Sequence, residues 1–125
     1  MTRTIFLVDD EPAWLSALSD ALEQQDFKVV SFEKGEEVLK KLKSQKPDLI
    51  LSDVRMPVMN GFDLFERVKS EPKFKKIPYI FMSSIDDYDA KRVAKELGAD
   101  DYVIKPYDTE DVKNIMTSLV KRFNL

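Results

Sequence analysis

The sequence contains neither cysteine nor histidine. Without cysteine, disulfides, thiol nucleophiles and cysteine-based zinc sites are excluded. Without histidine, the chain lacks the commonest general base and the commonest transition-metal ligand, so catalytic triads built on histidine are excluded as well. The side chains that remain for chemistry are carboxylates, lysines and hydroxyls, together with the hard metal ions that carboxylates bind.

Long apolar runs and blocks of like charge are also missing. No stretch approaches the length that crosses a membrane, and the apolar part of the N-terminal MTRTIFLVDD is too short for a signal peptide. The formal net charge of -3 is spread along the chain without a basic block, so nothing indicates nucleic-acid binding. We expect a cytoplasmic protein with no membrane segment and no direct contact with nucleic acid.

Length and composition are those of one globular domain. The chain has 125 residues, of which 43% are hydrophobic and 34% are charged. These values are ordinary for a folded domain with a real core and wrong for a disordered chain. No linker, repeat or low-complexity segment divides the sequence, so we expect a single domain over residues 1–125 with no output domain visible.

Short apolar runs alternate with amphipathic segments five times. The runs, rich in β-branched and aromatic residues, predict strands at residues 4–8, 28–32, 49–51, 79–82 and 102–104. Apolar residues at three- and four-residue spacing predict helices near residues 12–22, 35–45, 62–70 and 87–97, and a last one from 108 or 109 onward. This alternation is typical of an α/β fold, a parallel sheet with helices on both faces.

The residues that follow the predicted strands form the candidate site, because open parallel sheets bind ligands at the carboxyl ends of their strands. Close carboxylates repel one another unless a cation joins them, and ligand sets made of oxygen alone select hard ions such as Mg²⁺. An oxygen nucleophile, a metal site and a nearby positive charge are the parts that phosphoryl transfer needs. The residues are Asp9, Asp10 and Glu11 after the first strand, Asp53 after the third, Ser83 and Ser84 after the fourth, and Lys105 after the fifth.

Four segments closely resemble the receiver domain of two-component response regulators, of the chemotaxis-regulator-like type. They are FLVDDEP, DLILSDVRMPVMNGFDL, IPYIFMSS and GADDYVIKP, and the resemblance covers essentially the whole chain. It implies a flavodoxin-like, doubly wound, five-stranded parallel sheet with five helices. It also implies that Asp53 accepts a phosphoryl group from a histidine kinase or a histidine phosphotransfer protein.

The same resemblance implies a metal site and a pairing lysine. Mg²⁺ (or Mn²⁺) would bind Asp10, Asp53 and the backbone carbonyl of Arg55, and Asp9 would act mainly through bound water. Lys105 would pair with Asp53 and then with the phosphoryl group.

A switch and an output face are implied as well. Ser83 would swing to hydrogen-bond the phosphoryl group, and Tyr102 would follow it inward. The helix near 87–97, the strand at 102–104 and the last helix would signal to an output domain or partner protein. The protein would be a monomer or a phosphorylation-dependent dimer, and no enzyme beyond self-phosphorylation and autodephosphorylation. Because Ile115 stands where winged-helix transcription regulators carry arginine, we expect a different output, or none.

Two side chains are expected to tune hydrolysis of the aspartyl phosphate. Arg55, two residues after the acceptor, and Ile85, two after the switch hydroxyl, would flank the approach of water. Neither offers an acceptor for the protons of that water, and both add bulk. We therefore expect a long-lived phosphorylated form.

Other interpretations stay open at this point. Taken alone, Asp9 and Asp10 are ordinary helix caps and Asp53 is an ordinary turn residue. A haloacid-dehalogenase-type phosphatase would need a second aspartate at position 11, where this chain has Glu11. A flavodoxin would need a hydroxyl- and glycine-rich loop in place of DDEPAW, which would repel a phosphate in the absence of a metal. A binding-only pseudo-receiver is disfavoured, because all the acceptor-site residue types are present.

Overall fold

The structure is a computed structural model that describes residues 2–84, 87–105, 114, 117–118 and 120–122. These residues form five strands and four named helices. In chain order the elements are β1 (Arg3–Val8), α1 (Pro12–Glu23), β2 (Phe27–Phe32), α2 (Gly35–Leu42), β3 (Leu49–Asp53), α3 (Gly61–Lys69), β4 (Tyr79–Ser84), α4 (Tyr88–Leu97) and β5 (Asp101–Lys105).

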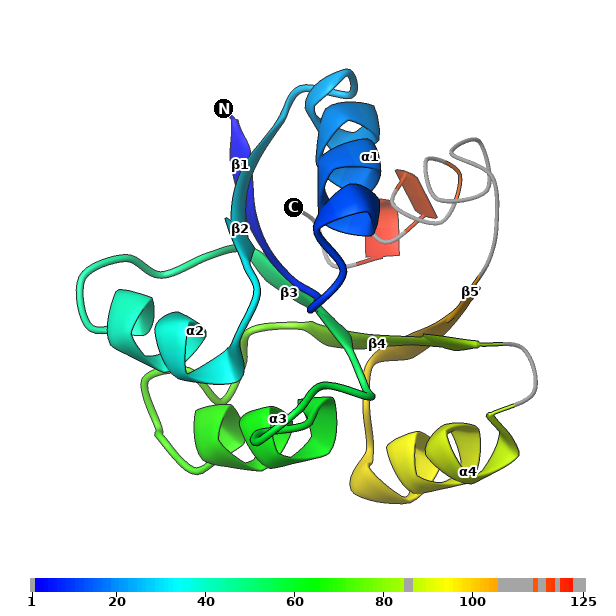
Figure 1. The fold of residues 1–125 in the computed structure, drawn as a ribbon. Helices are drawn as coiled ribbons and strands as arrows, with labels where there is room; N and C mark the ends of the chain where they lie inside the picture. The colour runs from blue at the N-terminus through cyan, green and yellow to red at the C-terminus, as the bar shows by residue number, and fades with distance from the viewer. Residues whose placement is uncertain (1, 85–86, 106–113, 115–116, 119, 123–125) are drawn as a thin grey trace.

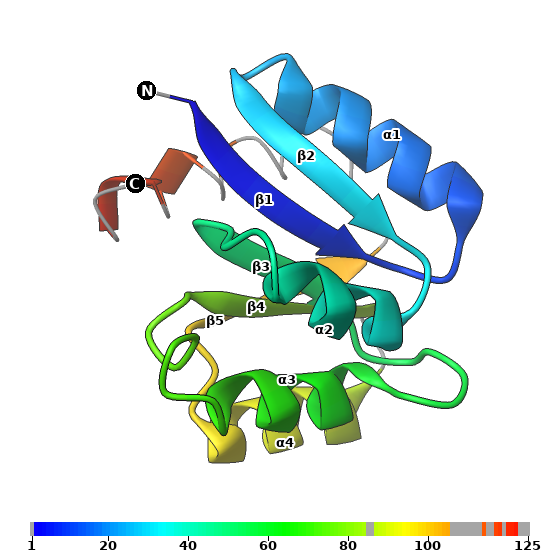
Figure 2. The ribbon, with the colours of Figure 1, turned by 90° about the vertical axis from the view of Figure 1, so that its left-hand side faces the viewer.

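The strands form one parallel sheet in the order β2-β1-β3-β4-β5. Helix α1 covers one face, and α2, α3 and α4 cover the other (Figures 1 and 2). The predicted doubly wound parallel sheet is therefore confirmed. A last helix was expected from residue 108 or 109 onward. The helical residues at 114, 117–118 and 120–122 belong to that segment and lie on the α1 side of the sheet, and the rest of the segment is outside the described residues. No helix in the described ranges combines the length and the apolar character needed to cross a bilayer.

Alternation along the strands divides the core into two layers. In β1, Ile5 and Leu7 point toward α1, whereas Phe6 and Val8 point toward the opposite helices, as the two-residue period of a strand requires. Every residue of the central strand β3 is buried. A continuous apolar run is expected for a strand covered on both faces, which is why LIL at the start of β3 predicts a strand without any polar alternation.

Two helix ends show how local chemistry sets the boundaries. Helix α4 closes at Gly98, which has φ 77° and so takes the left-handed conformation that favours glycine at the end of a helix. Helix α2 was expected to reach residue 45 but ends at Leu42. The apolar stripe stops there, and the Lys41 carbonyl in the last turn accepts from the Ser44 and Gln45 amides and from the Ser44 hydroxyl.

The close approach of the β3–α3 loop to the end of β3 explains the glycine at position 61. A Cβ at Gly61 would lie 2.3 Å from the Asp53 carbonyl oxygen, so only glycine fits at that position. The Gly61 amide donates to the Val54 carbonyl at 2.9 Å. Glycine therefore allows the loop to fold back tightly against the end of β3.

Val58, in the same loop, has a strained backbone. Its φ is 68°, a left-handed value that is an outlier for a β-branched residue. The side chain is 95% exposed and packs against almost nothing. The conformation thus costs free energy that the side chain does not recover.

We predict that Val58→Asn raises the free energy of unfolding by about 1 kcal/mol, because asparagine tolerates the left-handed region. The matched control is Val58→Thr, which keeps the β-branch and the size of the side chain. Urea unfolding of both variants tests this prediction. Equal stability of the Asn and Thr variants would show that the loop relaxes in solution and stores no strain.

Candidate functional site

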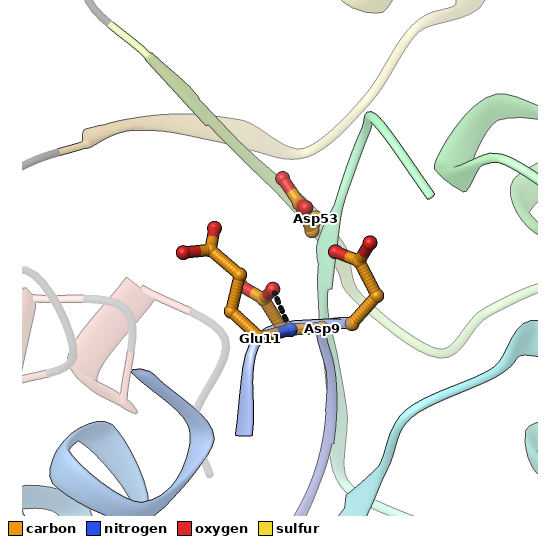
Figure 3. A group of neighbouring side chains, drawn as sticks. Asp9, Glu11 and Asp53 are labelled. Atoms are coloured by element: carbon orange, nitrogen blue, oxygen red, sulfur yellow. Dashed lines mark hydrogen bonds between the residues drawn. The ribbon is translucent and has the colours of Figure 1, made fainter. Parts of the chain in front are cut away.

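Carboxylates from two neighbouring strands meet at the carboxyl edge of the sheet (Figure 3). Val8 of β1 lies opposite Ser52 of β3, so the residues that follow Val8 come beside the end of β3. One carboxylate oxygen from each member of the cluster lies within 4.8 Å of the others. The members of this acidic cluster are Asp9, Asp10, Glu11 and Asp53.

Two members of the acidic cluster are buried. Asp9 is fully buried, and Asp53 is only 6% exposed. The Asp9 carboxylate accepts a hydrogen bond from the Glu11 amide at 3.0 Å, and the Asp53 carboxylate accepts one from the Val54 amide, also at 3.0 Å. Such amide bonds favour the charged forms of buried carboxylates. The set offers oxygen ligands only, at close quarters, which fits a hard divalent cation.

Glu11 is a member that the sequence interpretation left out of the metal set. It was read only as a residue following the first strand. Its direct adjacency to Asp10 is the signal that would have included it, because α1 begins at Pro12 and leaves Glu11 in the loop at the sheet edge.

Asp53 does not cap a helix. It is the last residue of β3, and α3 is capped instead by Asn60, whose side chain accepts from the Asp63 amide at 2.9 Å. The backbone carbonyl of Asp53 accepts from the Ser52 hydroxyl at 2.9 Å. These contacts fix the backbone of Asp53 and leave its carboxylate at the acidic cluster. Asp9 does not cap a helix either: its carboxylate accepts from the Glu11 amide in the loop after β1, and the N-cap residue of α1 is Glu11, which makes no side-chain capping bond.

The Asp87 carboxylate accepts hydrogen bonds from the side chains of Arg55 and Ser83. Two nitrogens of the Arg55 guanidinium donate to this carboxylate, Nε to Oδ2 at 2.9 Å and Nη2 to Oδ1 at 2.7 Å. The Ser83 hydroxyl, which is 2% exposed, donates to Asp87 Oδ2 at 2.7 Å. The Arg55 guanidinium, with smaller contributions from the Ser83 hydroxyl and the Ala90 amide, holds the pKa of Asp87 far below its ordinary value.

Asp87 was predicted only as the start of a helix. It is the N-cap of α4, and its carboxylate accepts from the Ala90 amide at 3.2 Å. Its link to Arg55 spans 32 positions in sequence and follows no pattern visible in the sequence.

The remaining predicted site residues lie on or next to β4 and β5. Tyr102 is half-buried opposite Phe81, and burial raises the pKa of its phenol. Strand β5 ends at Lys105, opposite Ser84, but the Lys105 side chain lies outside the described part of the structure. Ile85 and Ile115 are also outside the described residues.

Comparison with known proteins supports one family. Residues 5–117 match the response regulator receiver domain family. The chain is 32% identical over 122 residues to the alkaline phosphatase synthesis transcriptional regulatory protein PhoP of Bacillus subtilis, covering 98% of this chain and 50% of that protein. It is 34% identical to the DNA-binding transcriptional regulator NtrC of Escherichia coli, covering 95% of this chain and 25% of that protein.

A solved structure agrees over the whole fold. The signal receiver domain of a signal transduction histidine kinase from Syntrophus aciditrophicus superposes with a TM-score of 0.84 at 32% identity, covering 98% of this chain and 89% of that one. The chain spans half or less of the two curated relatives, whose other regions have no counterpart in it. With the family match and the acidic edge of a five-stranded parallel sheet, these likenesses show that the chain belongs to the receiver domain family of two-component response regulators, proteins that are phosphorylated on aspartate.

Proposed function

We propose that Asp53 is the phosphoacceptor of this receiver domain. The single observation that supports this most strongly is its position: a nearly buried carboxylate at the end of the central strand, within 4.8 Å of three other acids. A carboxylate oxygen of Asp53 forms the new P–O bond as the P–N bond of a phosphohistidine breaks. The leaving imidazole then takes a proton from solvent. The donor is a histidine kinase or a histidine phosphotransfer protein.

The acidic cluster supports a cation site of Mg²⁺ or Mn²⁺. Asp9, Asp10 and Asp53, with the backbone carbonyl of Arg55, would hold the ion, which supplies charge neutralisation for a phosphoryl group arriving among carboxylates. Asp9 is the most deeply buried of these acids, and its amide bond from Glu11 keeps its carboxylate oriented toward the cluster.

The remaining proposed functional residues lie near the ends of β4 and β5. Lys105 pairs with Asp53 and then with the phosphoryl group, Ser83 donates its hydroxyl proton to a phosphoryl oxygen, and Tyr102 moves inward behind Ser83. The register of β4 and β5 supports the proposed movement of Tyr102, because it places Tyr102 on the strand next to Ser83. Tyr102 lies opposite Phe81, two residues before Ser83, and Ile104 lies opposite Ser83 itself.

The output proposed for the domain is a change in the face formed by α4, β5 and the last helix. Response regulators receive phosphoryl groups from histidine kinases and act on output domains. Here that face would contact an output domain or a partner protein, in a cytoplasmic monomer or a phosphorylation-dependent dimer, without direct contact to nucleic acid. Catalysis is limited to Mg²⁺-dependent self-phosphorylation and autodephosphorylation.

The acceptor assignment predicts that acetyl phosphate adds one phosphoryl group per chain, and only when Mg²⁺ is present. Without the cation, the acids would repel the dianionic donor. Intact-mass spectrometry should show this addition on the parent and its absence on Asp53→Asn. The matched control is Asp20→Asn on α1, an exposed position outside the cluster, which should be modified like the parent. Full modification of Asp53→Asn, or full modification in EDTA, would contradict the assignment.

The lifetime of the phosphorylated form gives a separate prediction. Arg55 and Ile85 offer no group that orients an attacking water, so we expect slow phosphate loss. The double variant Arg55→Asn with Ile85→Glu should lose phosphate about tenfold faster after the donor is removed, because both new side chains can accept a hydrogen bond from the attacking water and orient it. Unchanged decay in the double variant would show that these side chains do not set the lifetime.

A further inference from the structure

The Asp87 carboxylate accepts more hydrogen bonds than helix capping requires. A single bond from the Ala90 amide already caps α4. Three further bonds come from the Arg55 guanidinium and the Ser83 hydroxyl. These bonds join the loop after β3, the end of β4 and the start of α4 through the Asp87 side chain. That side chain is 11% exposed, whereas the Arg55 side chain is 65% exposed.

The bond from Ser83 competes with the function proposed for that residue. A serine hydroxyl carries one proton, so it donates to one acceptor at a time. Here the proton goes to Asp87 Oδ2 at 2.7 Å, a charge-assisted bond to an ionised carboxylate. Donation to a phosphoryl oxygen on Asp53 requires that this bond break first.

Arg55 makes that bond harder to break. Its two-pronged contact orients the Asp87 carboxylate so that Oδ2 faces both Arg55 Nε and Ser83 Oγ. A planar guanidinium holds a carboxylate in a defined orientation, which a single point charge does not.

We propose that Asp87 is a positioning residue and that Arg55, Ser83 and Asp87 form a latch that opposes activation of the domain. The proposal rests on Asp53 being the phosphoacceptor. The latch keeps the Ser83 proton turned away from the phosphoryl position and releases it when the phosphoryl group competes successfully. Because Asp87 also caps α4, opening the latch removes a hydrogen bond from the residue that begins that helix, which links the acceptor site to α4 through named contacts.

The test is the initial rate at which acetyl phosphate, at saturating Mg²⁺, phosphorylates the whole chain. Arg55→Gln should raise the rate about two- to fivefold, the range expected for an ion pair with one exposed partner. Asp87→Asn should raise it as well, since asparagine still caps the helix but has no charge to hold Arg55 or to strengthen the serine bond. Arg67→Gln, an exposed charge loss on α3, serves as the control and should leave the rate unchanged.

The two latch variants separate the proposal from simple attraction of the anionic donor. They change the local charge in opposite directions, so donor attraction predicts opposite effects on the rate, whereas the latch predicts acceleration by both. In a Ser83→Ala background both accelerations should vanish, because the latch acts through that hydroxyl.

Opposite signs, unchanged rates, or accelerations that persist without Ser83 would overturn the latch. Absence of phosphorylation on Asp53 in the parent would instead overturn the proposed function, so the two failures are distinguishable.

Discussion

Electrostatic repulsion among the acids at the carboxyl edge of β1 and β3 is the constraint on which the rest of the site depends. Asp9 and Asp53 are buried or nearly so, and their charges are therefore less screened than those of surface acids. Hydrogen bonds from the Glu11 and Val54 amides stabilise the two buried carboxylates locally. A site of this kind binds a cation readily and, once neutralised, admits a phosphoryl group.

The fold supplies that arrangement through backbone geometry. Parallel strands β1 and β3 are neighbours, although β2 and α2 separate them in sequence, and their register brings Asp9 beside Asp53. Gly61 closes the loop against the Asp53 carbonyl, where any Cβ would collide. The backbone of the acceptor is thus held by main-chain contacts, and α3 is capped by Asn60 and not by Asp53. A change at Asp53 should therefore affect chemistry more than folding.

The sequence predicts most of this architecture, because strand and helix periods and the ends of strands are local properties. The five strands follow from five short apolar runs, and the acidic edge follows from Asp9 and Asp53, which come directly after or shortly after two of those runs. The features that the sequence does not predict depend on how the loops run in three dimensions. The Arg55–Asp87 pair joins residues 32 positions apart, and the left-handed turn at Val58 is occupied by a residue type that avoids it.

The repulsion itself is open to direct measurement by thermal unfolding in EDTA and in Mg²⁺. In EDTA, Asp10→Asn should raise the melting temperature by about 3 °C, because it removes one of four closely spaced negative charges, whereas Asp20→Asn on the outer face of α1 should not. Added Mg²⁺ should stabilise the parent more than Asp10→Asn, since the ion acts through the native state and loses a ligand in the variant. A lower melting temperature for Asp10→Asn in EDTA, together with equal Mg²⁺ shifts in both proteins, would show that the acids do not repel one another and do not share a cation.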